Sequence, residues 1–310
     1  MAGIMKRAPY VVAVALFGLC GCDIEDLGGF GRFNRDFHYS YPLNANGRVS
    51  VETFNGSIEI SGWDQNTVDI SGTKYGPSQS EADALNVSVD HAADSVDIRV
   101  VRPSIWRNNI GARFVLKVPR GAVVDRITAS NGAIRITDGA GPAHLKTSNG
   151  HITIEGLHGD VDAHTSNGAI DLMDIEGDVQ AHTSNGHIRA EGLNGSFDVS
   201  TSNGPVNAHL SKADRPVRAE SSNGAIELWL APNQSRDVRA HTSNSSITLH
   251  LSDPVNAHVS AHTSNSSINS NFGMTMSGEL KKNQMDGAIG AGGPLFDLST
   301  SNGPIRLLKM

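Results

Sequence analysis

Apolar and polar residues alternate along this chain in short runs, and each run ends in a turn of small polar residues. Ile152 and Ile154 mark one such run, and after a glycine a second run follows at Val161 and Ala163. Alternation with a period of two over four or five residues is typical of a half-buried β-strand. Beyond the N-terminal apolar stretch, no segment shows sustained helical periodicity. One repeat of the pattern therefore predicts two short strands and two turns.

The turn that marks each repeat is Ser-Asn-Gly or Ser-Asn-Ser, usually preceded by Thr or Ser. Its asparagines follow one another by four steps of 18 residues and then by steps of 20, 21, 21 and 37. The corner asparagines are Asn131, Asn149, Asn167, Asn185, Asn203, Asn223, Asn244, Asn265 and Asn302. The steps of 20 and 21 indicate one coil with a short extra loop, and the step of 37 leaves room for one further, degenerate coil.

A unit of two short strands cannot bury its apolar side alone, but units stacked on one another form a continuous core. The repeats therefore predict an all-β fold, a parallel β-solenoid with coils of about 18 residues. The main alternative is a series of hairpins, because Asn-Gly also closes two-residue hairpin turns. We favour the solenoid because identical turns would stack Asn on Asn, and stacked amides can hydrogen-bond along the column.

The residue types at the corners also predict the backbone φ angle there. Asn tolerates positive φ and Gly adopts it freely, so we expect positive φ at the corners, with Asn244 and Asn265 supplying it where Ser245 and Ser266 replace Gly. In mid-solenoid, the Asn185 side chain is expected to be buried between its neighbours. Asn302 is expected to lie in a terminal coil, with a neighbour on one side only.

The chain before the regular repeats has longer strands with looser spacing. Strands are expected at Arg48–Thr53, Ser57–Ser61, Thr67–Gly72, Asn86–Asp90, Ser95–Val101 and Arg113–Val118, with Phe54-Asn55-Gly56 as an early copy of the corner. We expect a tether in residues 22–44, with a first strand near its end, a broader N-terminal β region in residues 45–128, and regular solenoid repeats in residues 129–310. The whole is expected to form one elongated domain.

The N-terminus carries a processing signal. Lys6 and Arg7 precede an apolar stretch from Ala8 to Leu19, which is too short to span a bilayer. The run Leu19-Cys20-Gly21-Cys22 then resembles a bacterial lipobox, so residues 1–21 are expected to be a lipoprotein signal peptide and Cys22 the lipidated residue. An ordinary signal peptide with an incidental cysteine is the alternative. Several acyl chains on Cys22 would hold the protein at a membrane of the bacterial cell envelope.

The charge and aromatic content of the chain limit which kinds of molecule it is expected to bind. The chain has 25 Lys and Arg against 32 Asp and Glu, a net charge of −7, and loss of Lys6 and Arg7 would make it more negative. Nucleic-acid binding calls for a basic face, so no nucleic-acid partner is expected. Aromatic residues make up only 5% of the chain, which is low for a surface that stacks on sugars or bases. Removal of Cys20 would leave a single, lipidated cysteine and no disulfide.

Three segments carry a resemblance to a known family. They are Val51–Ile60, the repeated Thr-Ser-Asn-Gly-x-Ile, and the ending Gly292–Ile305. From roughly residue 45 to the C-terminus, the chain resembles the adhesin family of β-strand-repeat proteins, also called Toastrack domains. The resemblance implies a β-solenoid fold and an envelope location. It brings no catalytic motif, and the run of regular coils is longer than the family pattern requires.

Histidines share one register, three residues before the corner asparagines. In this outward-facing column His164 and His182 are expected one coil apart, and so are His241 and His262. Two imidazoles about 5 Å apart could share a transition metal, but structural and catalytic zinc sites use three or four protein ligands. We therefore expect a solvated polar column and no metal, with these four histidines as the weak candidates.

Carboxylates also stack in the expected coils. Asp160 and Asp178 follow the mid-coil glycine, and Asp162 and Asp198 flank Gln180. Paired acids on a β-helix suggest polysaccharide hydrolysis or calcium-assisted lyase chemistry, but a regular solenoid with short turns has little concavity. We therefore expect no enzyme and no cofactor.

The function expected from these observations is that of a non-catalytic envelope lipoprotein, an adhesin-like binding or scaffold protein. It would contact the membrane through its N-terminal lipid and an envelope protein or glycan through its repetitive face. A carbohydrate-active β-helix enzyme that acts on an envelope or extracellular polysaccharide is the alternative.

Overall fold

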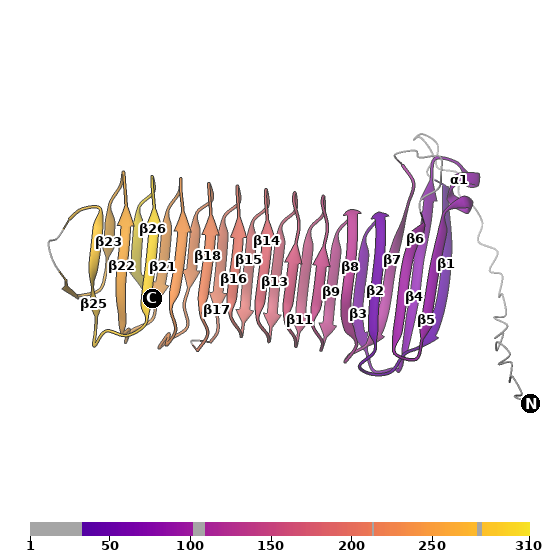
Figure 1. Cartoon of the computed structure of the whole chain (residues 1–310), viewed down its shortest axis with the longest axis horizontal. Coiled ribbons are helices and arrows are strands. Elements are labelled where there is room, and N and C mark those ends of the chain that lie inside the picture. Colours follow the sequence, from indigo (N-terminus) through magenta and orange to yellow (C-terminus); the bar gives the residue numbers. More distant parts are fainter. Residues whose placement is uncertain (1–32, 102–108, 213, 278–280) are drawn as a thin grey trace, which may run out of the picture. The chain divides into compact units, whose positions relative to one another are not determined.

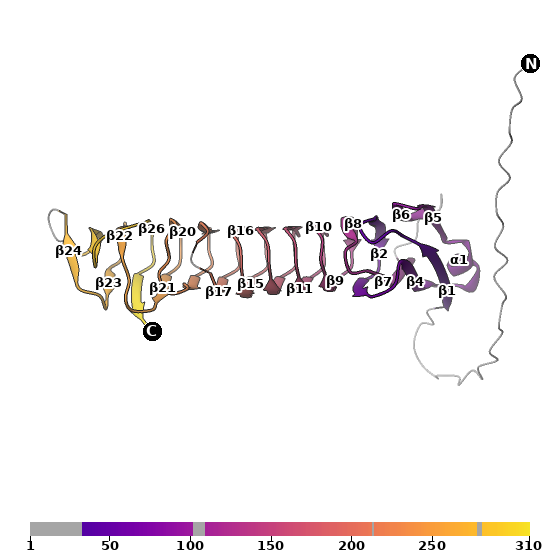
Figure 2. The ribbon, with the colours of Figure 1, turned by 90° about the horizontal axis from the view of Figure 1, so that it is seen from below.

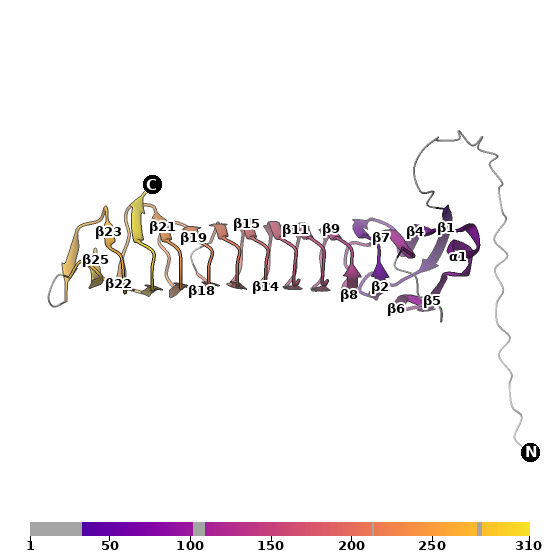
Figure 3. The same cartoon turned by 90° about the horizontal axis from the view of Figure 1, so that it is seen from above.

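Two long β-sheets, sheet A and sheet B, lie face to face as two layers (Figure 1, Figure 2 and Figure 3). The computed structural model describes residues 33–101, 109–212, 214–277 and 281–310. In spatial order, sheet A consists of β1 (Phe33–Pro42), β4 (Thr67–Gly76), β7 (Gly111–Pro119), β3 (Ile58–Trp63), β9 (Ile134–Gly139), β11 (Ile152–Leu157), β13 (Ile170–Ile175), β15 (Ile188–Leu193), β17 (Val206–Leu210), β19 (Ile226–Trp229), β21 (Ile247–Leu251), β27 (Ile305–Lys309) and β23 (Ile268–Ser270).

Sheet B holds the other half of each coil. In spatial order it consists of β24 (Met274–Met276), β25 (Gln284–Ile289), β22 (Ala257–Thr263), β26 (Leu295–Thr300), β20 (Val238–Thr242), β18 (Val217–Ser221), β16 (Phe197–Thr201), β14 (Val179–Thr183), β12 (Val161–His164), β10 (Ala143–Lys146), β8 (Val123–Asn131), β2 (Arg48–Asn55), β6 (Ser95–Val101) and β5 (Asn86–Ala92). In the middle of the molecule the chain alternates between the sheets, so each coil contributes one strand to each.

Successive coils pair in parallel and keep one register through most of the repeats, with irregularities between β8 and β10 and between β15 and β17. Ile152 of β11 lies opposite Ile170 of β13, and Val161 of β12 lies opposite Val179 of β14. Both pairs are 18 residues apart, so the sequence period is the coil period. The fold is the parallel β-solenoid that the repeats predict.

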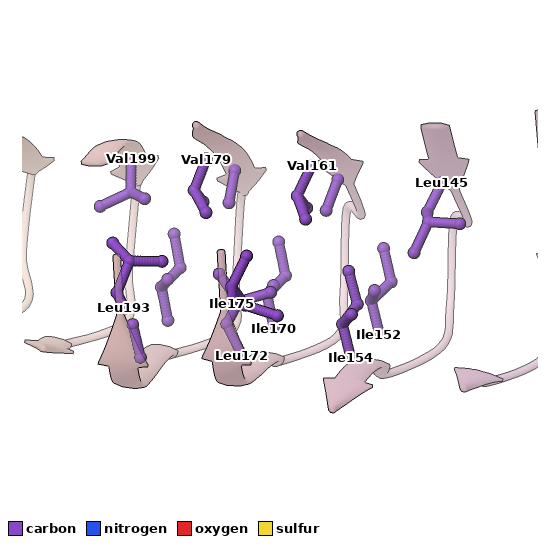
Figure 4. Close-up of a cluster of buried hydrophobic side chains, with 14 of the residues drawn as sticks. Leu145, Ile152, Ile154, Val161, Ile170, Leu172, Ile175, Val179, Leu193 and Val199 are labelled. Carbon is purple, nitrogen blue, oxygen red and sulfur yellow. The ribbon is translucent and has the colours of Figure 1, made fainter. Parts of the chain in front are cut away.

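The inward side chains of the two sheets form one continuous hydrophobic core (Figure 4). In one coil, Ile152, Ile154 and Leu157 of sheet A are fully buried, and so is Ala163 of sheet B, in the same core. The polar residues between them face solvent, as the period of two requires. Because each coil buries its apolar side only against its neighbours, the core depends on stacking.

The N-terminal part departs from a regular solenoid. β1 pairs antiparallel with β4, β4 pairs antiparallel with β7, and β5 pairs antiparallel with β6. β1 lies within the segment expected to be a tether. β2 and β3 form the first coil and stack directly on β8 and β9, so Asn55 lies opposite Asn131 across 76 residues of sequence.

One short helix, α1 (Gln79–Ala84), was not expected from the sequence. Ser78 is its N-cap, and the Ser78 hydroxyl accepts a hydrogen bond from the Glu81 backbone N–H. The four residues Ser78 to Glu81 are a capping box, which was the available sequence signal. In the described part of the chain no helix has the length and apolar character needed to cross a membrane.

At the C-terminal end the chain turns back into the solenoid. β24 and β25 follow β23, and β25 pairs antiparallel with β22. β26 and β27 then lie between two earlier coils, where the yellow strands interrupt the orange ones in Figure 1. The degenerate coil expected in the 37-residue step is therefore wrong. Asn302 belongs to an internal coil, not a terminal one.

Candidate functional site

The corner asparagines form one hydrogen-bonded column along the molecule. Each Nδ2 donates to the Oδ1 of the preceding coil over 2.7–2.8 Å, as from Asn185 to Asn167 and from Asn203 to Asn185. In spatial order the column, here called the Asn ladder, consists of Asn55, Asn131, Asn149, Asn167, Asn185, Asn203, Asn223, Asn244, Asn302 and Asn265.

Two expectations about the corner asparagines are wrong. The Asn185 side chain is exposed, because the ladder runs along the outside of the corner. Among the described non-glycine residues, positive φ occurs at Asp138, Asp174 and Asn233, and not at any corner Asn. The Asn-Ser corners at Ser245 and Ser266 therefore do not depend on positive φ either.

The corner glycines are needed for close approach of successive coils. A Cβ placed on Gly150 would lie 1.9 Å from the carbonyl oxygen of Gly132, and one on Gly204 would lie 1.8 Å from that of Gly186. Real Cβ atoms do not approach backbone oxygens this closely, so a side chain at these glycines would require the corner backbone to shift. Backbone proximity, and not a left-handed conformation, explains the repeated glycine.

The threonine that opens each corner is buried, and sequence reasoning gave it no role. Thr183 is fully buried, and its hydroxyl donates to the Gly168 carbonyl over 2.8 Å and accepts from the Gly186 N–H over 3.2 Å. Equivalent bonds to the preceding coil come from Thr165, Thr201 and other members of the column. The signal was a Thr or Ser two residues before nearly every corner Asn.

A groove runs beside the Asn ladder on the sheet A side of the corner. It has a volume of about 570 Å³, is open to solvent, and spans several coils. Its lining residues include Asn167, Asn185, His187, Arg189 and Asn207. The ladder Asn recurs along the groove in each coil, whereas the position after the corner glycine changes from His151 to Ala169, His187 and Pro205.

The groove offers both acceptors and donors. Asn167 Oδ1 and Asn185 Oδ1 each accept one hydrogen bond within the column, which leaves each oxygen a second lone pair. His187 Nε2 lies 3.2 Å from Asp171 Oδ1. Arg189 Nε donates to Glu191 over 3.1 Å, and this bond raises the pKa of Arg189 and lowers the pKa of Glu191. The groove wall therefore carries two polar side chains, His187 and Arg189, each paired with a carboxylate beside the groove.

The histidine column lies on the outer face of sheet B. The His164 and His182 rings are in adjacent coils, with centroids 6.1 Å apart. His182 Nδ1 lies 2.8 Å from Ser200 Oγ, and His164 Nε2 lies 2.7 Å from Asp162 Oδ1. Each ring thus has a polar partner on the protein.

His241 and His262 do not lie in adjacent coils. Ser299 lies between His241 and His262 in the sheet, and His241 Nδ1 is 2.8 Å from Ser299 Oγ. The expectation that His241 and His262 are one coil apart is wrong because the C-terminal coil separates them. Among the described residues, no cluster of three or more His, Cys, Asp or Glu side chains is arranged to hold a metal ion.

Two of the stacked carboxylates cap backbone groups. Asp160 Oδ1 accepts from the Asp178 N–H, and Asp178 Oδ1 accepts from the Ser196 N–H, both over 2.9 Å. The bond from Ser196 lowers the pKa of Asp178. Asp162 and Asp198 lie on the outer face of sheet B, in coils separated by that of Gln180. Asp160 and Asp178 thus tie one turn to the next.

An aromatic stack on sheet A was not recognised in the sequence. The Trp229 ring lies between His209 and His250, with centroids 4.0 and 4.5 Å away and nearly parallel planes. The three residues occupy one register in adjacent coils. Because each Trp229 face is covered by an imidazole, this tryptophan has no free face on which a sugar could stack. His250 also contacts Glu227 over 2.8 Å.

The expected lipidation site lies outside the described residues. Cys22, Cys20 and the expected signal peptide all precede residue 33. The structure therefore bears on the solenoid and not on the anchor.

Comparison with known proteins identifies a family. The family model described as Toastrack DUF4097 matches residues 42–273. No curated protein matches the chain.

Solved structures to which this chain is similar come from three bacteria. A proposed adhesin from Bacteroides fragilis is 13% identical, with 88% of this chain and 97% of that chain covered and a TM-score of 0.39. A proposed cell adhesion protein from Clostridium sporogenes is 10% identical, with 89% and 100% covered and a TM-score of 0.23. A proposed lipid-binding protein from Parabacteroides distasonis is 14% identical, with 88% and 96% covered and a TM-score of 0.34.

Proposed function

Since this chain belongs to the Toastrack DUF4097 family, we propose that it is a non-catalytic, adhesin-like protein of the bacterial cell envelope that binds an extended, hydroxyl-rich polymer. The observation that supports this proposal is the groove beside the Asn ladder. The groove presents a ladder Asn in each coil, at Asn167, Asn185 and Asn203, so it suits a ligand that is itself repetitive. Such a ligand gains affinity from many weak contacts in register.

The chemistry of the groove favours a glycan over an apolar ligand. Ladder oxygens such as those of Asn167 and Asn185 recur at the coil spacing, about 4.8 Å. Their free lone pairs accept hydrogen bonds, and hydroxyl groups are the donors that a polysaccharide offers. His187 and Arg189 add polar groups at the groove wall. The ligand would lie along the corner and remain largely exposed, because the groove is open.

We also propose that the protein is held at a membrane through lipid on Cys22. The basis is the lipobox run that ends at Cys22, after an apolar stretch too short to span a bilayer. A lipid anchor before β1 would keep the solenoid in the envelope, where glycans are abundant.

Co-sedimentation with insoluble polymers tests the binding proposal. The probes are purified peptidoglycan and cellulose, with and without competing soluble fragments. We expect at least one polymer to retain the protein and His187→Ala to weaken binding about three- to tenfold, the loss of one hydrogen bond. His182→Ala is the matched control, because His182 is an exposed histidine of the same coil on the other sheet.

Two outcomes would contradict the proposal. Binding to neither polymer would contradict a glycan as the ligand. Equal weakening by His187→Ala and His182→Ala would contradict the groove as the binding site. The supernatants also test the alternative function. New reducing ends or unsaturated sugars released from the polymer would identify a carbohydrate-active enzyme.

A further inference from the structure

The last coil of the solenoid lies where sequence order does not place it. This C-terminal coil, β26 and β27, lies between the coil formed by β20 and β21 and the coil formed by β22 and β23. Phe296 is opposite Val238 on one side and Val259 on the other. The C-terminal coil thus fills a slot one coil wide.

The slot is tightly built. Asn302 donates to Asn244 and accepts from Asn265, each over 2.7–2.8 Å, so the Asn ladder continues through the slot. The Phe296 side chain is 1% exposed, and the Leu298, Ile305 and Leu307 side chains are completely buried. In the sheets, β22 pairs with β25 and β26, and β23 pairs with β27. The outer coil is therefore attached to the rest of the solenoid through the C-terminal coil.

The two coils that flank the slot share the same eight residues. Ala-His-Thr-Ser-Asn-Ser-Ser-Ile occurs at residues 240–247 and again at 261–268. Each corner presents the same hydrogen-bonding groups to the coil that docks on it, so the outer coil can stack directly on residues 240–247. Residues 261–268 also precede the C-terminal coil in the chain and are available first during synthesis. Such a direct stack would have to open before the C-terminal coil could enter.

We propose that this slot accepts the C-terminal coil of a second copy of the chain, which produces a dimer by exchange of residues 295–309. Every contact inside the slot is the same whether the coil comes from its own chain or from the partner, so the difference lies in the connection alone. That connection contains Gly290 and Gly292, with φ of 60° and 75°. A glycine-rich link of this kind changes its path at low conformational cost.

A pair of engineered cysteines reports the exchange. His241 and Ser299 are register partners across the slot, with Nδ1 and Oγ 2.8 Å apart. One chain carries His241→Cys, the other carries Ser299→Cys, and both carry Ser at positions 20 and 22. Entry of one chain's C-terminal coil into the other's slot holds the two thiols in register. The full-length chains are co-refolded at equal concentration and then oxidised.

The matched control uses the same chemistry where no exchange is expected. His182 Nδ1 and Ser200 Oγ are also 2.8 Å apart, but their strands belong to coils that follow each other in sequence. Chains carrying His182→Cys and Ser200→Cys are mixed in the same way. A single chain with both His241→Cys and Ser299→Cys establishes that the pair can form a disulfide.

The expected result is a disulfide-linked dimer in the slot mixture that rises with protein concentration, and at least tenfold less dimer in the control mixture. Equal yields in the two mixtures would overturn the proposal, because they would indicate random collision. Absence of dimer in the slot mixture while the doubly substituted chain closes its internal disulfide would also overturn it. Failure of that internal disulfide would contradict the placement of the C-terminal coil itself.

Discussion

The carbonyl oxygen of Gly168 lies 1.8 Å from the position that a Cβ on Gly186 would occupy. Gly186→Ala must therefore shift the backbone of this corner, and we expect it to lower the free energy of unfolding by about 1–3 kcal/mol. Gly273→Ala is the control, since no heavy atom lies within 4 Å of a Cβ placed there. Chemical denaturation of both variants gives the comparison. A similar loss at the two positions would show that close coil approach is not what requires glycine.

The buried threonine column gives a second prediction. Thr183→Val keeps the shape but leaves the Gly168 carbonyl and the Gly186 N–H without their hydroxyl partner, at about 1–3 kcal/mol for a buried unsatisfied group. Thr183→Ser keeps the hydroxyl and removes one methyl group, which costs about 0.8 kcal/mol. Ser221 already occupies the equivalent position one corner from Thr201. If valine is tolerated better than serine, packing and not hydrogen bonding stabilises this column.

The Asn ladder predicts a rank order that depends on the inserted coil. Asn185→Val and Asn302→Val each remove two ladder bonds, whereas Asn265→Val removes one. At about 0.5–1.5 kcal/mol per net bond, the first two variants should lose similar stability and more than the third. Thermal unfolding decides the order. A smaller loss at Asn302 than at Asn265 would mean that the C-terminal coil is the last of the stack after all.

Asp178 predicts part of the response to acid. Its depressed pKa means that this group stabilises the folded protein above the ordinary carboxyl pKa, and that the stabilisation disappears as pH falls through the depressed value. Asp178→Asn keeps an oxygen acceptor and removes the charge. The fall in melting temperature between pH 7 and about pH 2 should therefore be smaller in the variant than in the natural protein. Asp90→Asn, on the exposed face of β5, is the control, and an identical effect there would assign the difference to net charge.

The proposed anchor is tested by Cys22→Ala. We expect the variant to leave the detergent phase, because its acyl chains would be absent. Its mass should be that of the unprocessed chain, or of a processed chain without lipid. Cys20→Ala is the control and should partition as the natural protein does. Unchanged partitioning and mass in the Cys22 variant would show that Cys22 is not the lipidated residue.

The middle of the fold could be predicted from sequence because its information is periodic. Ile152 and Ile170 are 18 residues apart in the chain and adjacent in the sheet, so one repeat length describes both. The strand order at the ends could not be predicted in this way. Every corner presents the same groups, so nothing in the motif around Asn302 says whether it stacks after Asn265 or before it. That order is determined by the excursion through β24 and β25, which carries no repeat.

The groove and its neighbours were only partly predictable for a related reason. Column alignment places His164 beside His182, but the reason for each corner glycine is a distance between backbones, which no single repeat contains. Positive φ was the wrong explanation because it considers one turn alone. The stack of His209, Trp229 and His250 needed the exact coil register across unequal steps of 20 and 21 residues.

The edges of the two sheets have a consequence for how the length of the solenoid can change during evolution. Within the described residues, β1, β5 and β24 close three edges and each runs antiparallel to its neighbour, while the fourth edge is the three-residue β23. Three of the four edges are thus finished by strands that do not copy the repeat, and coils between the ends touch only adjacent coils. Duplication or deletion of one 18-residue unit would change the span by about 4.8 Å and leave both ends intact. Recombination within the repeats of the gene can therefore lengthen or shorten the solenoid by one coil at a time.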